Sequence, residues 1–178
     1  MKYMKHILSS AVLFVLIAVG SPRAPRAAGQ DADQTPASNP LSGAKFVSLP
    51  VAPQCFTIAV ERGNPANGPS VVLAKFAPGC VAPFHWHTPS ETAMVVSGSL
   101  ETQMKDDKAF VAHHGDFVYL PPHHVHRATC RGSEPCLVFL SSDAPFDIHW
   151  VDATGQEIPL EAAMQAVKPA SATPSKKQ

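Results

Sequence analysis

The sequence predicts an all-β fold, a single antiparallel barrel or sandwich with one short helix near its C-terminal end. Short runs rich in β-branched and aromatic residues follow one another from about residue 45 to residue 151. Turn signals containing Gly, Pro, Asn or Asp separate these runs. Strands this short and this evenly spaced are typical of antiparallel sandwiches and barrels. A helical spacing of apolar residues follows them, over 158–167.

The individual runs define the expected elements. The strands are expected, in order, at 46–49, 55–60, 71–76, 92–96, 100–104, 109–112, 116–120, 125–130 and 137–141. A last extended segment, 146–151, is expected to cover an edge of the barrel and is given no chemical role. In the helix, Leu160, Ala163, Met164 and Val167 recur at helical spacing. This helix is therefore expected to pack on the outside of the barrel.

Length and charge limit the kinds of partner. The chain has 178 residues, the usual size of one domain, and shows no internal repeat. Its 14 Lys and Arg residues balance its 14 Asp and Glu residues, so the formal net charge is zero. A nucleic-acid partner would require a basic stripe, which argues against that class of function. Nothing in the charge favours an anionic membrane surface either.

The N-terminal segment has the pattern of a signal peptide. Lys2 and Lys5 form a basic start, residues 7–19 are almost all apolar, and small residues at 18–20 suit cleavage. The apolar run is shorter than the roughly 20 residues that a spanning helix needs, which favours a cleaved signal over a membrane anchor. Cleavage could also fall later, up to Ala28. We therefore expect a periplasmic or secreted protein with no membrane association after cleavage.

The composition divides the chain into four parts. Residues 21–43 and 169–178 contain mostly Pro, Ala, Ser, Gln, Asp and Lys, with few large apolar side chains. The predicted organisation is a signal peptide at 1–20, a disordered linker at 21–43, a folded domain at 44–168 and a disordered tail at 169–178.

Export makes the four cysteines candidates for disulfide bonds. Three pairings are possible. Cys130–Cys136 is favoured, because five residues containing Gly132 and Pro135 separate them and a hairpin there would set them opposite each other. Cys55–Cys80 then follows by elimination. Free buried thiols are the alternative.

The residues with metal-ligand character lie between 85 and 126. In a strand, alternate side chains share a face, so His85 and His87 lie on one side, about 6.5 Å apart along the backbone. Two imidazoles at that separation can converge on one ion. Glu91 follows a turn at 88–90, and a hairpin would return its carboxylate to the same ion. His126 belongs to a later strand and comes close only if a barrel closes.

This pattern resembles the cupin superfamily. The first cupin motif, a Gly, five residues, His-x-His, three or four residues, Glu, six residues and a Gly, matches Gly79, His85, His87, Glu91 and Gly98. The second motif matches at Gly115, Pro121 and His126. It departs at His123, where Gly is usual, and at Cys130, where Asn is usual. The first departure concerns the turn, since Gly often marks a backbone conformation that other residues avoid. The resemblance covers about residues 45–150.

The resemblance implies a single jelly-roll cupin barrel holding one divalent metal ion on His85, His87, Glu91 and His126. Three imidazoles and a carboxylate suit Mn, Fe, Co, Ni or Zn. The implied function is an enzyme acting on a small metal-chelating substrate, with a dioxygenase-type oxidoreductase favoured and Glu91 able to serve as a catalytic base. Alternatives are a lyase or isomerase, a non-catalytic periplasmic binding or sensing protein, and a closed structural or metal-buffering site. A homodimer is also implied.

The remaining polar and aromatic candidates are given structural roles. His113, His114, His123 and His124 flank turns, where solvated loop histidines are the ordinary interpretation. Trp86 is out of phase with His85 and His87, which indicates packing or a subunit contact. Tyr119 could donate a proton, but a place in the core is the favoured interpretation.

Overall fold

The computed structural model describes residues 36–167. The predicted signal peptide, most of the predicted linker and the predicted tail lie outside the described residues. Of the linker, residues 36–43 are described, and they include a short 3-10 helix, η2 (Leu41–Gly43). The Asn39 side-chain amide donates a hydrogen bond to the Glu61 carbonyl (3.1 Å). None of the helices in 36–167 is long and apolar enough to cross a membrane.

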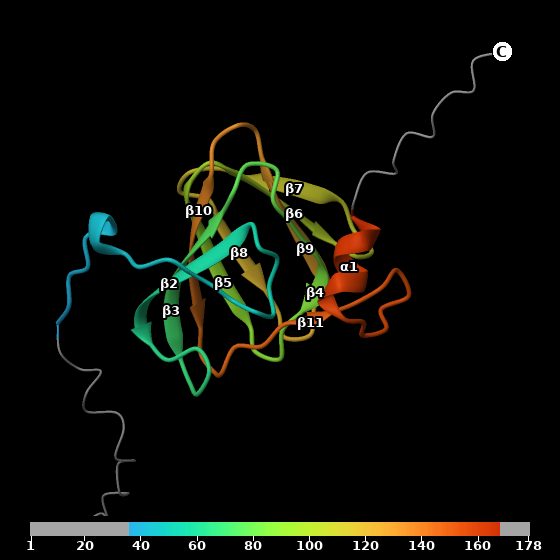
Figure 1. Ribbon diagram of the computed structural model, residues 1–178, viewed down its shortest axis with the longest axis horizontal. Coiled ribbons are helices and arrows are strands. Elements are labelled where there is room, and N and C mark those ends of the chain that lie inside the picture. Colours follow the sequence, from blue (N-terminus) through green and yellow to red (C-terminus); the bar gives the residue numbers. More distant parts are fainter. Residues whose placement is uncertain (1–35, 168–178) are drawn as a thin grey trace, which may run out of the picture. The chain divides into compact units, whose positions relative to one another are not determined.

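Two antiparallel sheets form the fold, which confirms the all-β prediction (Figure 1). The six-stranded sheet has the order β1 (Val47–Ser48), β2 (Phe56–Gly63), β3 (Ser70–Phe76), β10 (Cys136–Ser142), β5 (Glu91–Ser97), β8 (Phe117–Leu120). The five-stranded sheet has the order β11 (His149–Trp150), β4 (Val81–Trp86), β9 (His126–Arg131), β6 (Ser99–Met104), β7 (Ala109–Ala112). The predicted helix is α1 (Leu160–Ala166), which packs against β4 with Ala163 buried.

The core lies between the two sheets and follows the two-residue period of the strands. In β3, Val72, Ala74 and Phe76 are buried while Lys75 is exposed, as expected when alternate side chains face the opposite sheet. Many of the inward positions are alanines, including Ala82, Ala93 and Ala128. Small side chains on facing strands leave interior space, so this core encloses a cavity rather than closing completely.

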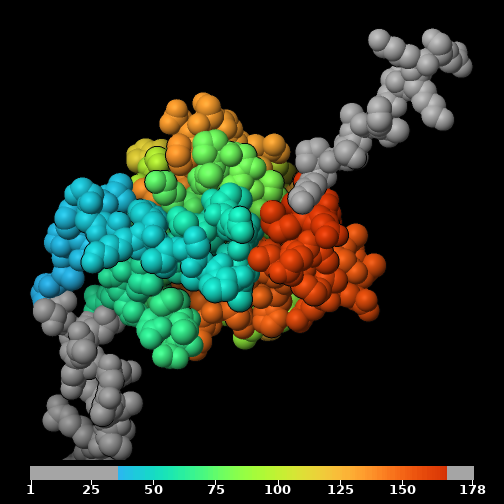
Figure 2. Space-filling model, in the orientation of Figure 1, coloured from blue at the N-terminus to red at the C-terminus, as the bar shows by residue number. Residues whose placement is uncertain are grey.

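The segment between β1 and β2 covers one opening of this interior. In Figure 2 this segment, drawn in cyan, lies beside α1, drawn in red, and a surface groove is lined by both. The Trp150 indole N–H donates a hydrogen bond to the Val51 carbonyl (2.9 Å) and ties the segment to β11. Ala52 and Pro53 of this segment line the interior cavity.

Both disulfide bonds are present, Cys55–Cys80 and Cys130–Cys136, as predicted. The hairpin argument for the second bond is wrong, because β9 and β10 belong to different sheets. Each bond therefore links one sheet to the other. The Cys130 N–H also donates to the Cys80 carbonyl (2.9 Å), so both bonds gather at one end of the sheets.

Removing the Cys55–Cys80 bond is expected to destabilise the protein more than removing Cys130–Cys136. The first closes a loop with a sequence separation of 25 and the second one of 6. Loop-closure entropy then gives losses of about 3.5 and about 2.3 kcal/mol in the free energy of unfolding. Urea unfolding of the two double-serine variants measures both losses. Equal losses, or the reverse order, would contradict the entropic explanation.

Candidate metal centre

Three strand ends bring the predicted ligands together. His85 lies at the end of β4 and pairs with His126, the first residue of β9. His87 is the first residue after β4, and Glu91 is the first residue of β5. The expected hairpin between His87 and Glu91 is wrong, since β4 and β5 lie in different sheets. The turn instead carries the chain across the interior, so Glu91 approaches the histidines from the facing sheet.

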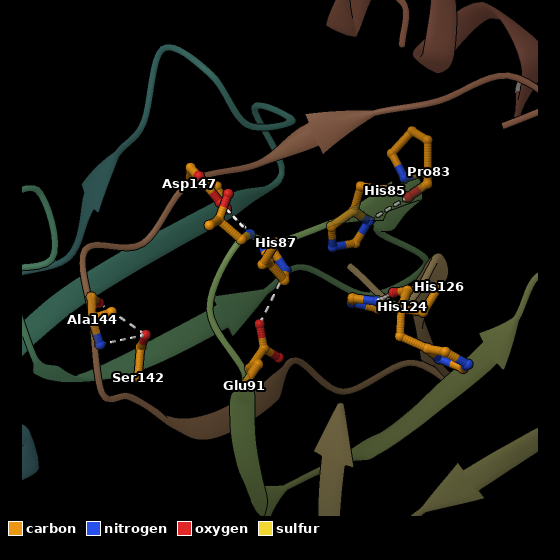
Figure 3. A network of polar contacts seen from close by, with 10 residues as sticks. Pro83, His85, His87, Glu91, His124, His126, Ser142, Ala144 and Asp147 are labelled. Carbon is orange, nitrogen blue, oxygen red and sulfur yellow. Dashed lines mark hydrogen bonds and ion pairs between the residues drawn. The ribbon is translucent and has the colours of Figure 1, made fainter. Parts of the chain in front are cut away.

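The four side chains surround one small space (Figure 3). One nitrogen from each of His85, His87 and His126 lies within 4.8 Å of the others, a spacing suited to a shared ion. The ring centroids are 4.3 to 5.3 Å apart. Glu91 Oε2 lies 3.2 Å from His87 Nε2. The structure thus brings together all four residues that the motif predicts, and all three histidines are buried.

Backbone carbonyls determine which ring nitrogen of each histidine carries the proton. In every case Nδ1 lies beside a carbonyl oxygen, which only accepts, so Nδ1 donates and Nε2 keeps its lone pair. The three pairs are His85 with the Pro83 carbonyl (2.6 Å), His87 with the Asp147 carbonyl (2.5 Å) and His126 with the His124 carbonyl (2.8 Å). Such outer contacts orient histidines that bind metals.

Pro83 explains one of these contacts. Proline has no backbone N–H, and the ladder between β4 and β9 changes register between Ala82 and His85. At this irregularity the Pro83 carbonyl accepts from His85 Nδ1. The proline inside β4 therefore provides an acceptor that orients the first ligand.

The four ligand atoms are all acceptors, and a bound cation would satisfy them better than the protein alone does. With their protons on Nδ1, the three Nε2 atoms are acceptors, and the Glu91 carboxylate is an acceptor as well. His87 Nε2 is buried and makes no hydrogen bond of acceptable geometry among the described residues, although the Glu91 carboxylate is near. Buried polar atoms ordinarily have partners. Convergent acceptors without a donor are what a divalent cation would satisfy.

Burial favours the unprotonated, metal-binding form of two ligands, His85 and His126. Burial, with the nearby His126 and His87, lowers the pKa of His85 well below its ordinary value. Burial lowers the pKa of His126 to about 4. For Glu91 burial raises the pKa, but the neighbouring His87 and His126 more than offset it, so the pKa lies below its ordinary value. At neutral pH His85 and His126 are therefore unprotonated and Glu91 is a carboxylate.

The ligands lie in a cavity of about 60 Å³ whose walls are otherwise almost entirely apolar. Among the described residues that line it, the side chains able to form hydrogen bonds are His85, His87, Glu91, Thr102 and His126, with the Trp150 indole committed to Val51. Sequence analysis did not identify Thr102. Its inward position follows from alternation along β6, where Leu100 and Thr102 are buried.

The segment 146–150 forms one side of the site, although sequence analysis gave it no chemical role. The Phe146 ring lies 4.2 Å from the His87 ring, and the Trp150 ring lies 4.9 Å from the His85 ring, centroid to centroid. The Asp147 carbonyl accepts from His87 Nδ1. Phe146, Ile148 and Trp150 all line the cavity, and this two-residue alternation of large apolar residues was the available signal in the sequence.

The other candidates lie outside the cavity. Trp86 stacks on His149 at 3.8 Å, away from the ligands, in agreement with the packing role expected for it. Tyr119 is 53% exposed, so the expectation that it fills the core is wrong. In β8 the inward positions are taken by Val118 and Leu120, which places Tyr119 on the outer face.

His123 adopts the left-handed conformation that the motif normally assigns to glycine, with φ 59°. Its backbone N–H donates to the His87 carbonyl (2.8 Å), so the turn contacts the ligand segment. Its ring lies 4.7 Å from Trp86. The departure from the motif therefore places a residue with a side chain in a backbone conformation that L-residues rarely adopt.

Replacing His123 with glycine is expected to stabilise the protein by about 0.5–1 kcal/mol. Glycine removes the steric cost of the left-handed conformation. The gain in stability is smaller than that cost, because glycine has more conformational freedom in the unfolded chain. Urea unfolding measures the change, with His124→Gly as the control, because His124 lacks a positive φ. A loss of stability in His123→Gly would mean that the contact with Trp86 outweighs the strain.

Comparison with known proteins bears on the fold. Residues 72–142 match the family model of the cupin domain. The polyketide cyclase RemF from Streptomyces resistomycificus is similar, with a TM-score of 0.57 at 17% identity, over 66% of this chain and 87% of that one. An RmlC-like cupin protein from Ralstonia eutropha has a TM-score of 0.57 at 17% identity, and the match covers 74% of this chain and 87% of that one. An RmlC-like cupin from Shewanella frigidimarina has a TM-score of 0.51 at 19% identity, and the match covers 64% of this chain and 94% of that one. No curated protein sequence gave a match. The two facing sheets agree with the jelly-roll architecture.

Proposed function

We propose that this chain, which belongs to the cupin superfamily, binds one divalent metal ion and is an enzyme that acts on a small metal-chelating substrate. The ligands would be the Nε2 atoms of His85, His87 and His126 and the carboxylate of Glu91. The supporting observation is the convergence of three histidine nitrogens beside a carboxylate inside an apolar cavity. Imidazole and carboxylate ligands suit Mn, Fe, Co, Ni or Zn.

The residues around the site indicate the kind of reaction. When bound, the ion supplies Lewis acidity and, if it is Fe, Mn, Co or Ni, redox chemistry. Among the described lining residues, the only ionisable side chains are the four ligands. A lyase or isomerase would therefore need Glu91 to serve as the catalytic base as well as a ligand. We favour a dioxygenase-type oxidoreductase, which depends less on a separate acid or base.

Charge restricts the substrate. A divalent ion together with the Glu91 carboxylate leaves one positive charge in the site, and the described lining residues include no Lys or Arg. A monoanionic chelating group, such as an enolate, a 1,3-diketonate or a singly ionised diol, would bring the total to zero. A dicarboxylate would leave a net negative charge in an apolar cavity, which is costly. We therefore propose a monoanionic head and not a dicarboxylic acid.

Metal analysis combined with oxygen uptake tests this function. The mature protein is purified without chelators or nickel affinity resin, analysed for metals, and assayed with 1,3-diketones, enols and diols against oxalate and malonate. About one equivalent of Fe, Mn, Co or Ni, with oxygen uptake for the monoanionic group only, is expected. Glu91→Gln is the control, since it keeps the size of the side chain and removes its charge. A protein that binds no metal would refute the site.

A non-catalytic binding protein is the second candidate. The same lack of a spare acid or base beside the ligands is what a site that only captures a ligand would have. Bound zinc, or metal with tight chelator binding and no turnover, would favour this candidate over the dioxygenase. Turnover without oxygen uptake would favour a lyase or isomerase.

Export is proposed from the cysteines. Two disulfide bonds in one small domain are typical of proteins from oxidising compartments. We therefore place the protein in the periplasm or outside the cell, where the supply of metals helps to determine which ion fills the site.

A further inference from the structure

A second cavity lies directly beside the metal cavity. Its volume is about 190 Å³, compared with about 60 Å³ for the cavity that contains the ligands. The side chains of Phe56, Leu140, Phe146 and Ile148 line both cavities. The two spaces are therefore separated by one layer of side chains.

The metal cavity alone accepts only a small group. One water molecule needs about 10–15 Å³ of cavity volume. The metal cavity, at about 60 Å³, therefore holds a group of only a few heavy atoms. That is enough for the chelating oxygens of a substrate and the carbons that join them. A larger substrate must extend into neighbouring space, and the second cavity is the space that shares its walls.

The second cavity suits an apolar group. Its lining includes Leu49, Val51, Ile58 and Val72, and no Lys, Arg or His occurs among the described residues that line it. The carboxylate of Asp147 is already engaged, because it accepts from the Thr88 N–H (2.7 Å) and lies 3.3 Å from His149 Nε2. The Ser142 hydroxyl donates to the Ala144 carbonyl (3.0 Å). Few groups in this cavity could offset the free-energy cost of removing a charged or strongly polar tail from water.

Phe146 is the side chain best placed to connect the cavities. Its backbone N–H donates to the Pro65 carbonyl (2.7 Å), which holds the main chain at this point. Its ring lies against His87, and the residue is only partly buried. A change of its side-chain rotamer would therefore open a passage without any movement of the backbone.

We propose that the substrate is amphipathic, with a chelating head in the metal cavity and an apolar tail of several carbon atoms in the second cavity. This inference rests on the proposed metal site and adds the class of substrate. It assigns Phe146, Ile58 and Val72 to tail recognition, although none of them is a metal ligand.

A series of alkyl hydroxamates tests the proposal, because each is a monoanionic chelator that differs only in its tail. Binding of acetohydroxamate through octanohydroxamate to the metal-loaded mature protein is measured by calorimetry. Affinity is expected to rise about fourfold for each methylene that becomes buried in the second cavity, so burial of about three or four methylenes gives on the order of 100-fold over the series. In parallel, the NMR methyl signals of Ile58 and Val72 are expected to shift with the long ligands and not with acetohydroxamate.

Two variants separate the tail site from the metal site. Val72→Phe fills the second cavity from a position that does not line the metal cavity, and Ala66→Trp narrows it from an exposed loop. Both are expected to remove most of the gain with tail length and to leave acetohydroxamate binding unchanged. Strong acetohydroxamate binding with a flat response to tail length would overturn this inference alone. Failure of acetohydroxamate to bind the metal-loaded protein would overturn the proposed function together with it.

Discussion

Replacing His126 with alanine is expected to remove most of the bound metal, with an affinity at least 100-fold below that of the unaltered protein. Even outer contacts to metal ligands are worth 10- to 100-fold in affinity, and this change removes a ligand itself. His87→Ala is expected to behave in the same way, because its Nε2 belongs to the same cluster. Elemental analysis and competition with a calibrated chelator measure the loss.

The matched control is His124→Ala. His124 is exposed and two residues from His126, and its backbone carbonyl accepts a hydrogen bond from the His126 ring. Because alanine keeps that carbonyl, the control variant is expected to retain its metal. Undiminished metal in both His87→Ala and His126→Ala would refute the assigned site, whereas equal losses in His124→Ala would show that the effect is not specific to the ligands.

The candidate ligands could be predicted from the sequence because their spacing reflects local geometry. His85 and His87 share a side of the chain because strand residues alternate, and this holds even though His87 lies just beyond β4. His126 is about 40 residues away in sequence, and its approach depends on the pairing of β4 with β9 within the five-stranded sheet. Only the resemblance to a motif could place it in advance.

Sheet membership could not be predicted from the same local reasoning. Short connections suggested hairpins after His87 and after Cys130, but both cross from one sheet to the other. The correct disulfide pairing was obtained because a short connection brings its ends together in either arrangement. The arrangement matters for function, since the crossing before Glu91 places its carboxylate on the wall facing β4 and β9.

The cavity walls were the least predictable part. Phe146 and Trp150 contact two histidines, yet the segment that carries them has only a two-residue strand, β11. The volumes depend on many alanines facing one another across the sheets, a property of pairs of strands rather than of any one motif. Packing between distant segments decides what the cavity can hold, and therefore what the protein can bind.

Acidification is expected to destabilise the metal-free protein strongly between pH 6.5 and pH 4. In the unfolded chain a histidine takes up its proton near pH 6.5, whereas in the folded chain burial lowers the pKa of His126 to about 4 and that of His85 well below its ordinary value. Within this window the unfolded state binds more protons, so lowering the pH favours unfolding. At pH 5 His126 is expected to cost about 2 kcal/mol relative to neutral pH, and His85 acts in the same direction.

Urea unfolding of the metal-free protein at pH 7, 6 and 5 measures this dependence, and His126→Asn tests its origin. Asparagine does not titrate, so the variant is expected to lose less stability on acidification, by about 2 kcal/mol at pH 5. An unchanged pH dependence would show that His126 is not kept neutral by burial. The same burial connects stability with metal binding: folding holds His85 and His126 unprotonated in moderately acidic solution, so these two ligands need not release protons before they bind an ion.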